Sequence, residues 1–257
     1  MGGQPDDLLV PGVSALTNAS ERRRLRRVGH KGADLLVPGN TRESFDAALE
    51  IGVDMIEFDV LSERQDGSGA LLLAHDYRSA GAGRSLTLQE GLDHLAGPAF
   101  AGVEFDVDLK IPGYELRVLE ALQASGLAQR SLVSSTYPES LDLLRRAEPS
   151  LRLGWSIPRA RRDYTGSRLT LLPALAVLAA YRARLPGRAH GALASGRFDA
   201  IMAHWRLITP ALVRAVRSGG GELYAWTVDD AGVIATLTRL GVDAIITNDP
   251  RLFEARR

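Results

Sequence analysis

Short apolar runs alternate with longer amphipathic segments along most of the chain. Nine runs have the length and residue types of β-strands: Arg27–His30, Asp54–Val60, Ala70–His75, Val103–Leu109, Ser131–Ser135, Leu151–Ser156, Ala200–His204, Glu222–Val228 and Ala244–Thr247. Eight stretches have a helical pattern: Thr41–Ile51, Leu86–Leu95, Tyr114–Ser125, Pro138–Ala147, Leu171–Ala183, Pro210–Ser218, Ala231–Leu240 and Pro250–Ala255. Strands that alternate with helices favour parallel βα units. Eight units and one extra strand predict a (β/α)8 TIM-type barrel in a single domain.

Proline and glycine support these boundaries. Pro210 and Pro250 stand where a first helical turn tolerates proline, and helix ends are followed by Gly52, Gly126, Gly219 and Gly241. We expect residues 27–257 to form the barrel and residues 1–26 to form an N-terminal extension. Two segments rich in arginine and glycine, Arg159–Ser167 and Arg182–Arg197, are predicted to be exposed loops.

Composition narrows the classes of protein and of site. The 257 residues are 45% hydrophobic and 24% charged, which is ordinary for a soluble globular protein. Basic and acidic residues number 31 each, so the zero net charge argues against a nucleic-acid binder that relies on phosphate contacts. The chain has no cysteine, which excludes disulfides and thiolate metal sites. Any bound metal must be held by oxygen or imidazole ligands.

The N-terminal region suggests a cytoplasmic protein. Residues 1–21 lack the basic and then apolar pattern of a signal peptide, and no apolar run approaches the ~20 residues that span a bilayer. The basic run Arg22–Arg27 is interpreted as a solvated segment that leads into the first strand. The weaker alternative for this run is attraction to an anionic lipid surface.

Polar residues with catalytic chemistry end the early strand-like runs. His30 ends the first run, Glu57 and Asp59 lie near the end of the second, and His75 closes the third. In a parallel barrel, active sites form at the C-terminal ends of the strands. Glu57 and Asp59 are two residues apart, so on a strand both point to the same side, as ligands of a shared divalent cation would. The alternative, an acidic pair on a solvated strand, becomes less attractive once both histidines are placed at the same end.

The ordered motifs resemble those of the glycerophosphodiester phosphodiesterase family, within the phospholipase C-like phosphodiesterases. The resemblance runs from about residue 27 to the C-terminus and rests on His30-Lys31-Gly32, Pro38-Gly39-Asn40-Thr41, Glu57-Phe58-Asp59, His75-Asp76, Asp108-Leu109-Lys110, Trp226-Thr227-Val228-Asp229 and the segment Gly241–Pro250. Three positions depart from the family pattern. Lys31 replaces arginine, Gly39 replaces the glutamate at the start of the first helix, and Asp108 replaces the third metal-binding glutamate. We expect Gly39 to leave a hole that Glu43, one helical turn on, compensates in part.

The resemblance implies a role for each matched residue. Glu57, Asp59 and Asp108 would hold a hard cation, Mg²⁺ or Ca²⁺. His30 and His75 would act as general base and acid, in an order that the sequence leaves open. Contacts with the phosphate or the rest of the substrate are expected from Lys31, Lys110, Trp226 and His204. Lys31 is also expected to be a catalytic group. Lys110 could instead be a counter-charge to the metal carboxylates.

The expected function is hydrolysis of a glycerophosphodiester to glycerol 3-phosphate and an alcohol, with a small-molecule phosphodiester as the partner. Two alternatives remain open at this stage. One is a phospholipase D-like enzyme that acts on lipid head groups, and the other is a non-catalytic barrel that binds phosphate esters, which the three departures favour. The preferred alcohol, the choice of cation and the oligomeric state are not readable from the sequence.

Overall fold

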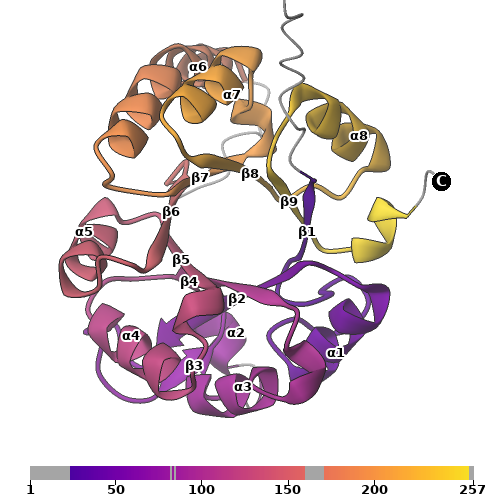
Figure 1. The fold of residues 1–257 in the computed structure, drawn as a ribbon, viewed down its shortest axis with the longest axis vertical. Coiled ribbons are helices and arrows are strands. Elements are labelled where there is room, and N and C mark those ends of the chain that lie inside the picture. Colours follow the sequence, from indigo (N-terminus) through magenta and orange to yellow (C-terminus); the bar gives the residue numbers. More distant parts are fainter. Residues whose placement is uncertain (1–23, 82, 84, 160–170, 255–257) are drawn as a thin grey trace, which may run out of the picture.

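The computed structural model describes residues 24–81, 83, 85–159 and 171–254. Eight parallel strands close into a barrel: β1 (Arg26–Gly29), β2 (Met55–Ser62), β4 (Glu104–Leu109), β5 (Ser131–Ser135), β6 (Arg152–Ile157), β7 (Ala200–His204), β8 (Glu222–Trp226) and β9 (Ala244–Thr247). Figure 1 looks down the barrel and shows the strands as an inner ring with the helices around it. The pairing of β1 with both β9 and β2 closes the ring. The predicted single-domain (β/α)8 barrel is confirmed.

The third strand along the chain lies outside the barrel wall. Strand β3 (Leu71–Leu73) pairs antiparallel with the end of β2, so that Val60 faces Leu73. The third apolar run is therefore the extra strand, and it is much shorter than the predicted Ala70–His75. His75 follows this short strand and reaches the mouth of the barrel from outside the ring.

The helices that cover the barrel agree closely with the predicted segments. They are α1 (Arg42–Ile51), α3 (Leu88–Leu95), α4 (Glu115–Ala124), α5 (Pro138–Ala147), α6 (Leu171–Ala194), α7 (Pro210–Ser218) and α8 (Ala231–Leu240). The sequence analysis did not predict the short α2 (Tyr77–Gly81) or the 3-10 turns η1 (Pro98–Phe100), η2 (Ala128–Arg130) and η3 (Trp205–Leu207). Thr41 caps α1 by accepting from the amide of Ser44, and Gly52 ends the helix with φ 82°.

Two predicted segments are wrong. The stretch Arg182–Arg197 is not a loop, because α6 continues through Pro186 to Ala194. Leu185, Ala189 and Leu193 recur every four residues and bury one face of this helix, which outweighs the intervening glycines. At the C-terminus, the predicted helix is only the 3-10 turn η4 (Pro250–Phe253). Apart from Arg159, the predicted loop Arg159–Ser167 lies outside the described residues, as does most of the extension 1–26.

The basic run before the first strand is also not simply a solvated segment. Arg26 belongs to β1 and enters the N-terminal end of the barrel, where it donates to Tyr224 Oη at 2.5 Å and pairs with Glu222 at 3.1 Å. Arg152, the first residue of β6, bonds to Glu104 at 2.9 Å and to Glu222 at 3.1 Å. Two arginines, two glutamates and a tyrosine thus form an ionic network that closes this end of the barrel, which we call the base network.

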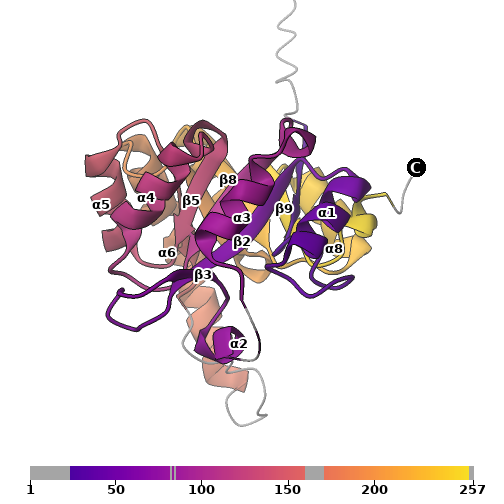
Figure 2. The same ribbon diagram turned by 90° about the horizontal axis from the view of Figure 1, so that it is seen from below.

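The barrel interior above the base network is apolar. Its buried residues are Val28, Met55, Leu132, Ala200, Met202, Tyr224, Ala244 and Ile246. A larger core lies between the strands and the helices and includes the contacting rings of Phe45, Phe58 and Phe105. These two layers hold the strands rigidly and leave their C-terminal ends free to carry polar groups. In Figure 2, α2 and one end of α6 extend beyond the barrel on the same side.

None of the helices in the described part of the chain has both the length and the hydropathy of a membrane-spanning segment.

Candidate active site

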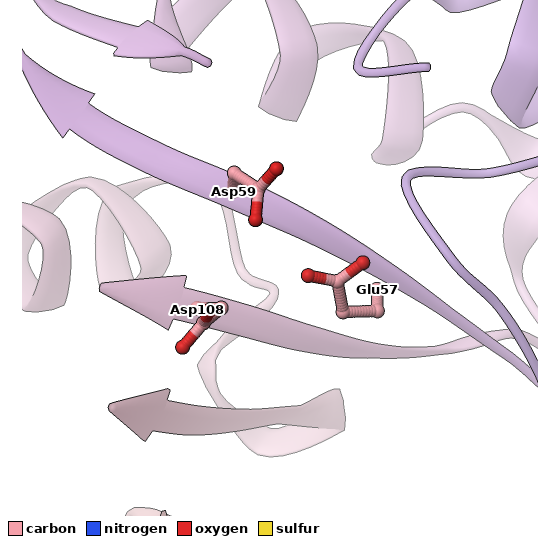
Figure 3. A group of neighbouring side chains, drawn as sticks. All are labelled: Glu57, Asp59 and Asp108. Atoms are coloured by element: carbon pink, nitrogen blue, oxygen red, sulfur yellow. The ribbon is translucent and has the colours of Figure 1, made fainter. Parts of the chain in front are cut away.

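Three carboxylates meet where β2 and β4 lie side by side. The register pairs Glu57 with Asp106 and Asp59 with Asp108, so all four acidic side chains belong to one patch of the inner barrel wall. Figure 3 shows Glu57, Asp59 and Asp108 next to one another on these two strands. One oxygen from each of these three lies within 4.8 Å of the others, and Glu57 and Asp59 are buried. The predicted metal ligands are therefore brought together.

The loop between β1 and α1 fixes the two carboxylates of β2. The side chain of Asn40 donates to Asp59 Oδ2 at 2.9 Å and accepts from the amide of Asp59 at 3.1 Å. The amide of Lys31 donates to Glu57 Oε2 at 2.8 Å. Lys31 and Asn40 have φ of 50° and 60°, a left-handed conformation that non-glycine residues rarely adopt. The strain is typical of a loop that is held in place for function.

Lys110 supplies the positive charge inside this cluster. Its ammonium lies 2.5 Å from Asp108 Oδ2 and also contacts Asp59 Oδ1. Burial alone would lower the pKa of Lys110, but Asp108, Asp59 and Glu57 together raise it well above its usual value. Lys110 is thus a counter-charge to Asp59 and Asp108.

Lys110 alone does not compensate the negative charge of the four carboxylates in this cluster. Burial and the charge of Asp59 raise the pKa of Glu57 well above its usual value, and burial and the charge of Asp108 raise the pKa of Asp106 to about 8. Burial also acts to raise the pKa of Asp59, but the charge of Lys110 and the contact with His75 lower it well below normal. Oδ1 of Asp106 is buried and accepts no hydrogen bond from the described residues, whereas Oδ1 of Asp59 is met by the Lys110 ammonium. A buried carboxylate oxygen without a donor beside three further carboxylates fits a cation site.

His30 is held by a chain of hydrogen bonds from the last strand. Its Nδ1 lies 2.6 Å from Asn248 Oδ1, and Asn248 Nδ2 donates to Asp229 Oδ2 at 2.6 Å. Because the amide group of Asn248 is directed by Asp229, its oxygen accepts from His30, which places the imidazole proton on Nδ1. Nε2 of His30 is then a free acceptor, 3.8 Å from Glu57 Oε2. Burial lowers the pKa of His30 and favours this neutral form.

His75 lies on the other side of the carboxylates. Its Nδ1 is 3.3 Å from Asp59 Oδ2, and its side chain is 55% exposed. It is the one described residue that lines both of two neighbouring cavities. The first, of about 400 Å³, also contains His30, Glu57, Asp108 and Lys110. The second, of about 410 Å³, lies between α1 and the segment after β3 and contains Lys31, Glu43 and Ser79. We call them the carboxylate cavity and the side cavity.

Of the four predicted substrate contacts, Lys110 and Trp226 line the carboxylate cavity, whereas Lys31 and His204 do not. Trp226 lines the carboxylate cavity and donates from Nε1 to the carbonyl of Met202 at 2.8 Å. The ammonium of Lys31 faces the side cavity and pairs with Asp34 at 2.5 Å. His204 packs edge-on against Trp226 and stacks on Trp205, and it is not among the described residues that line either cavity.

The space at Gly39 is not a hole, contrary to the prediction. Gly39 donates its amide to Asp34 Oδ1 at 2.8 Å, and a Cβ on Gly39 would lie only 2.5 Å from that oxygen and 2.6 Å from Lys31 Cβ. Asp34 therefore fills the position with its own carboxylate. Lys31, Asp34 and Gly39 form one interlocked unit, and Glu43 lines the side cavity instead of supporting the carboxylates.

Several residues of the site were missed as functional groups. Asn40 and Asn248 stand inside motifs on which the resemblance rests, so the motifs themselves could have identified them. Asp106 precedes Asp108 by two residues, which places it on the same face of β4. Arg159 also lines the carboxylate cavity, and no local pattern distinguishes it from the other arginines around it.

Comparison with known proteins agrees with this geometry. Residues 30–83 and 100–252 match the glycerophosphoryl diester phosphodiesterase family. A glycerophosphodiester phosphodiesterase of Caldanaerobacter subterraneus is 28% identical over 87% of this chain and 93% of its own. A probable glycerophosphodiester phosphodiesterase 2 of Mycobacterium tuberculosis is 29% identical over 86% of each chain.

Solved structures share the fold. A putative glycerophosphoryl diester phosphodiesterase from Silicibacter pomeroyi superposes with a TM-score of 0.69 at 21% identity, covering 89% of this chain and 91% of that one. A phosphodiesterase from Oleispira antarctica, in complex with the product sn-glycerol-3-phosphate, has a TM-score of 0.62 at 17% identity and covers 90% and 95%. The family match spans most of the barrel, and the chain therefore belongs to the glycerophosphoryl diester phosphodiesterase family of phosphoric diester hydrolases.

Proposed function

We propose that the protein hydrolyses glycerophosphodiesters to glycerol 3-phosphate and an alcohol, with a divalent cation and two histidines. The observation that carries this proposal is the carboxylate cavity. Three carboxylates, Lys110 and both histidines lie together at the C-terminal end of the barrel strands. This is the end at which barrels of this kind build active sites.

Glu57, Asp59 and Asp108 would hold the cation, either Mg²⁺ or Ca²⁺. The oxygen-only ligand set, and the buried Asp106 oxygen without a donor beside it, support a hard ion. When bound, such an ion neutralises charge on phosphoryl oxygens. Ser134, which donates to Asp108 Oδ1 at 3.3 Å, would help to orient that shorter carboxylate.

The hydrogen bonds support different roles for the two histidines. His30 is neutral, with its proton on Nδ1, so its free Nε2 can take a proton from the attacking hydroxyl. That hydroxyl belongs either to the substrate's own glycerol or to water. His75 contacts Asp59 through Nδ1 and is exposed, which leaves Nε2 to protonate the departing alkoxide. The position of His75 between the two cavities suits a group that meets the leaving alcohol.

The test is turnover of glycerophosphocholine and glycerophosphoethanolamine, each with and without excess EDTA. We expect release of glycerol 3-phosphate that stops with EDTA and returns when Mg²⁺ or Ca²⁺ is added in excess. Full turnover in EDTA would contradict the metal assignment. Tight binding of these diesters without any turnover would instead support a non-catalytic phosphate-ester-binding barrel.

A further inference from the structure

The carboxylate cavity has to accept an anionic phosphodiester although Glu57, Asp106 and Asp108 line it. When Glu57, Asp59 and Asp108 are ionised, a divalent cation and Lys110 balance their three negative charges. A bound phosphodiester adds one further negative charge, and the glycerol phosphate product adds nearly two. His75 gives up its proton as the general acid, so a permanent positive charge near the phosphate would still strengthen binding of the product.

The lysines do not supply it. Lys110 is engaged by both Asp108 and Asp59. Lys31 is paired with Asp34 in the side cavity, and the amide of Gly39 holds Asp34 in place by donating to its Oδ1. Both ammonium groups are therefore compensated by carboxylates before any substrate arrives.

Arg159 is the remaining cation in the lining of the carboxylate cavity. It follows β6 at the mouth of the barrel, and its guanidinium lies 3.9 Å from the centre of the Tyr137 ring. Among the described residues, no carboxylate pairs with Arg159. A cation over an aromatic ring uses none of its N–H groups for an ion pair, so they are available to an acceptor.

We propose that Arg159 binds the phosphate group of the substrate and of the glycerol phosphate product, and that Tyr137 positions it. This inference rests on the proposed function. The guanidinium offers the planar two-point contact to phosphate oxygens that an ammonium lacks. Arg159 thereby takes the part of the arginine that Lys31 replaces, from a different strand end, after β6 instead of β1.

The test compares binding with turnover in five variants of the full chain, one of them a control. Calorimetry with sn-glycerol 3-phosphate in excess Mg²⁺ measures product affinity, and steady-state kinetics with glycerophosphoethanolamine separate KM from kcat. We expect Arg159→Ala to weaken product binding and to raise KM about tenfold, with a smaller change in kcat. Arg159→Lys should lose part of the affinity, because the charge remains and the fork is lost.

Substitutions of Tyr137 test its positioning role separately, because they leave the charge of Arg159 unchanged. Tyr137→Phe keeps the ring and should behave as the wild type, whereas Tyr137→Leu should raise KM by a few fold. The matched control is Arg206→Ala. Arg206 is also an exposed arginine over an aromatic ring, 4.9 Å from the centre of Trp205, but it does not line the cavity. This control should leave both binding and KM unchanged.

The outcomes separate the two proposals. If the wild type turns over diesters and Arg159→Ala matches Arg206→Ala in product affinity and KM, the role of Arg159 is refuted while the proposed function stands. If the wild type neither hydrolyses the diesters nor binds glycerol 3-phosphate, both proposals are refuted. If only turnover is absent and Arg159→Ala still loses product affinity, the phosphate contact stands without the hydrolase.

Discussion

The two ends of the barrel both carry ionic clusters, but only one of them is balanced. In the base network, Arg26 and Arg152 face Glu104 and Glu222, and Tyr224 bonds to both arginines. At the mouth, four carboxylates of β2 and β4 surround Lys110, and the buried Oδ1 of Asp106 accepts no hydrogen bond from the described residues. Strand β4 contributes to both clusters, through Glu104 at the balanced end and through Asp106 and Asp108 at the unbalanced end.

This difference in charge balance indicates that the base network stabilises the fold and that the cluster at the mouth binds a ligand. A buried ion pair network that is fully satisfied holds strands in register, and its loss is felt as unfolding. A buried cluster of like charges destabilises the fold unless a ligand completes it, and its retention indicates that a ligand does so. The mouth is therefore expected to respond to substitution through activity, and the base network through stability.

The largest effect is expected from the carboxylates at the mouth. Glu57→Gln or Asp59→Asn removes one ionic ligand while keeping the shape of the side chain. Turnover should fall below detection, because the charge needed to hold the cation is lost. Without metal, Glu57→Gln should leave thermal unfolding unchanged or shift it upward, because burial and the charge of Asp59 already raise the pKa of Glu57. Asp59→Asn should lower the melting temperature, because Lys110 loses a counter-charge. Retained turnover in either variant would contradict the metal-binding role.

The histidines should come next. His30→Ala and His75→Ala should each lower kcat ~10²–10⁴-fold, the range of general acid–base catalysis. The double variant should lose little more, because the two act as a unit. The pH–rate profile should be bell-shaped, and since His30 must be neutral and its pKa is lowered, the acid limb should lie below pH 6.5. A flat profile between pH 5 and 9 would remove the histidines from the mechanism.

The base network should show the opposite behaviour. Arg152→Met leaves Glu104 and Glu222 with Arg26 as their remaining arginine partner in the network, so the free energy of unfolding should fall by about 2 kcal/mol. Chemical denaturation measures this change. The kcat and KM of the folded variant should match the wild type. A large kinetic effect with normal stability would show that the base network acts on catalysis, and would contradict its assignment to stability alone.

The smallest effect concerns Asp106. Its folded pKa of about 8 lies above its ordinary value of 3.8, so between these values the metal-free folded protein binds one proton more than the unfolded chain. Stability must then fall as the pH rises, by about 1.4 kcal/mol per pH unit from this group. Asp106→Asn should flatten that slope in denaturation measured in EDTA at pH 6 and 7. An unchanged slope would mean that Asp106 is ionised in the fold.

The sequence was a good guide wherever a local pattern decided the structure. Alternating apolar runs and caps such as Thr41 and Gly52 are sufficient for the barrel, and the two-residue spacing of Glu57 and Asp59 is sufficient to place them on one face. Helix α6 was truncated in the prediction because tertiary burial of Leu185 and Leu193 overrides glycine and proline signals.

What local patterns could not supply is the pairing between distant residues. That Asp34 engages Lys31 and excludes a side chain at Gly39 depends on a strained loop. That Asn248 fixes the proton of His30 depends on strands at opposite ends of the chain that become neighbours on barrel closure. The charge balance at the mouth depends on these pairings, and the proposed role of Arg159 in phosphate binding depends on that balance.

The central claim is that the incomplete cluster at the mouth is completed by a divalent cation. The most direct test is calorimetric titration of Mg²⁺ and of Ca²⁺ into chelator-treated wild type, Asp59→Asn and Arg152→Met. We predict that the wild type and Arg152→Met bind one ion with similar affinity and that Asp59→Asn shows no binding heat. Equal binding by Asp59→Asn and the wild type would place the ion elsewhere and contradict the account.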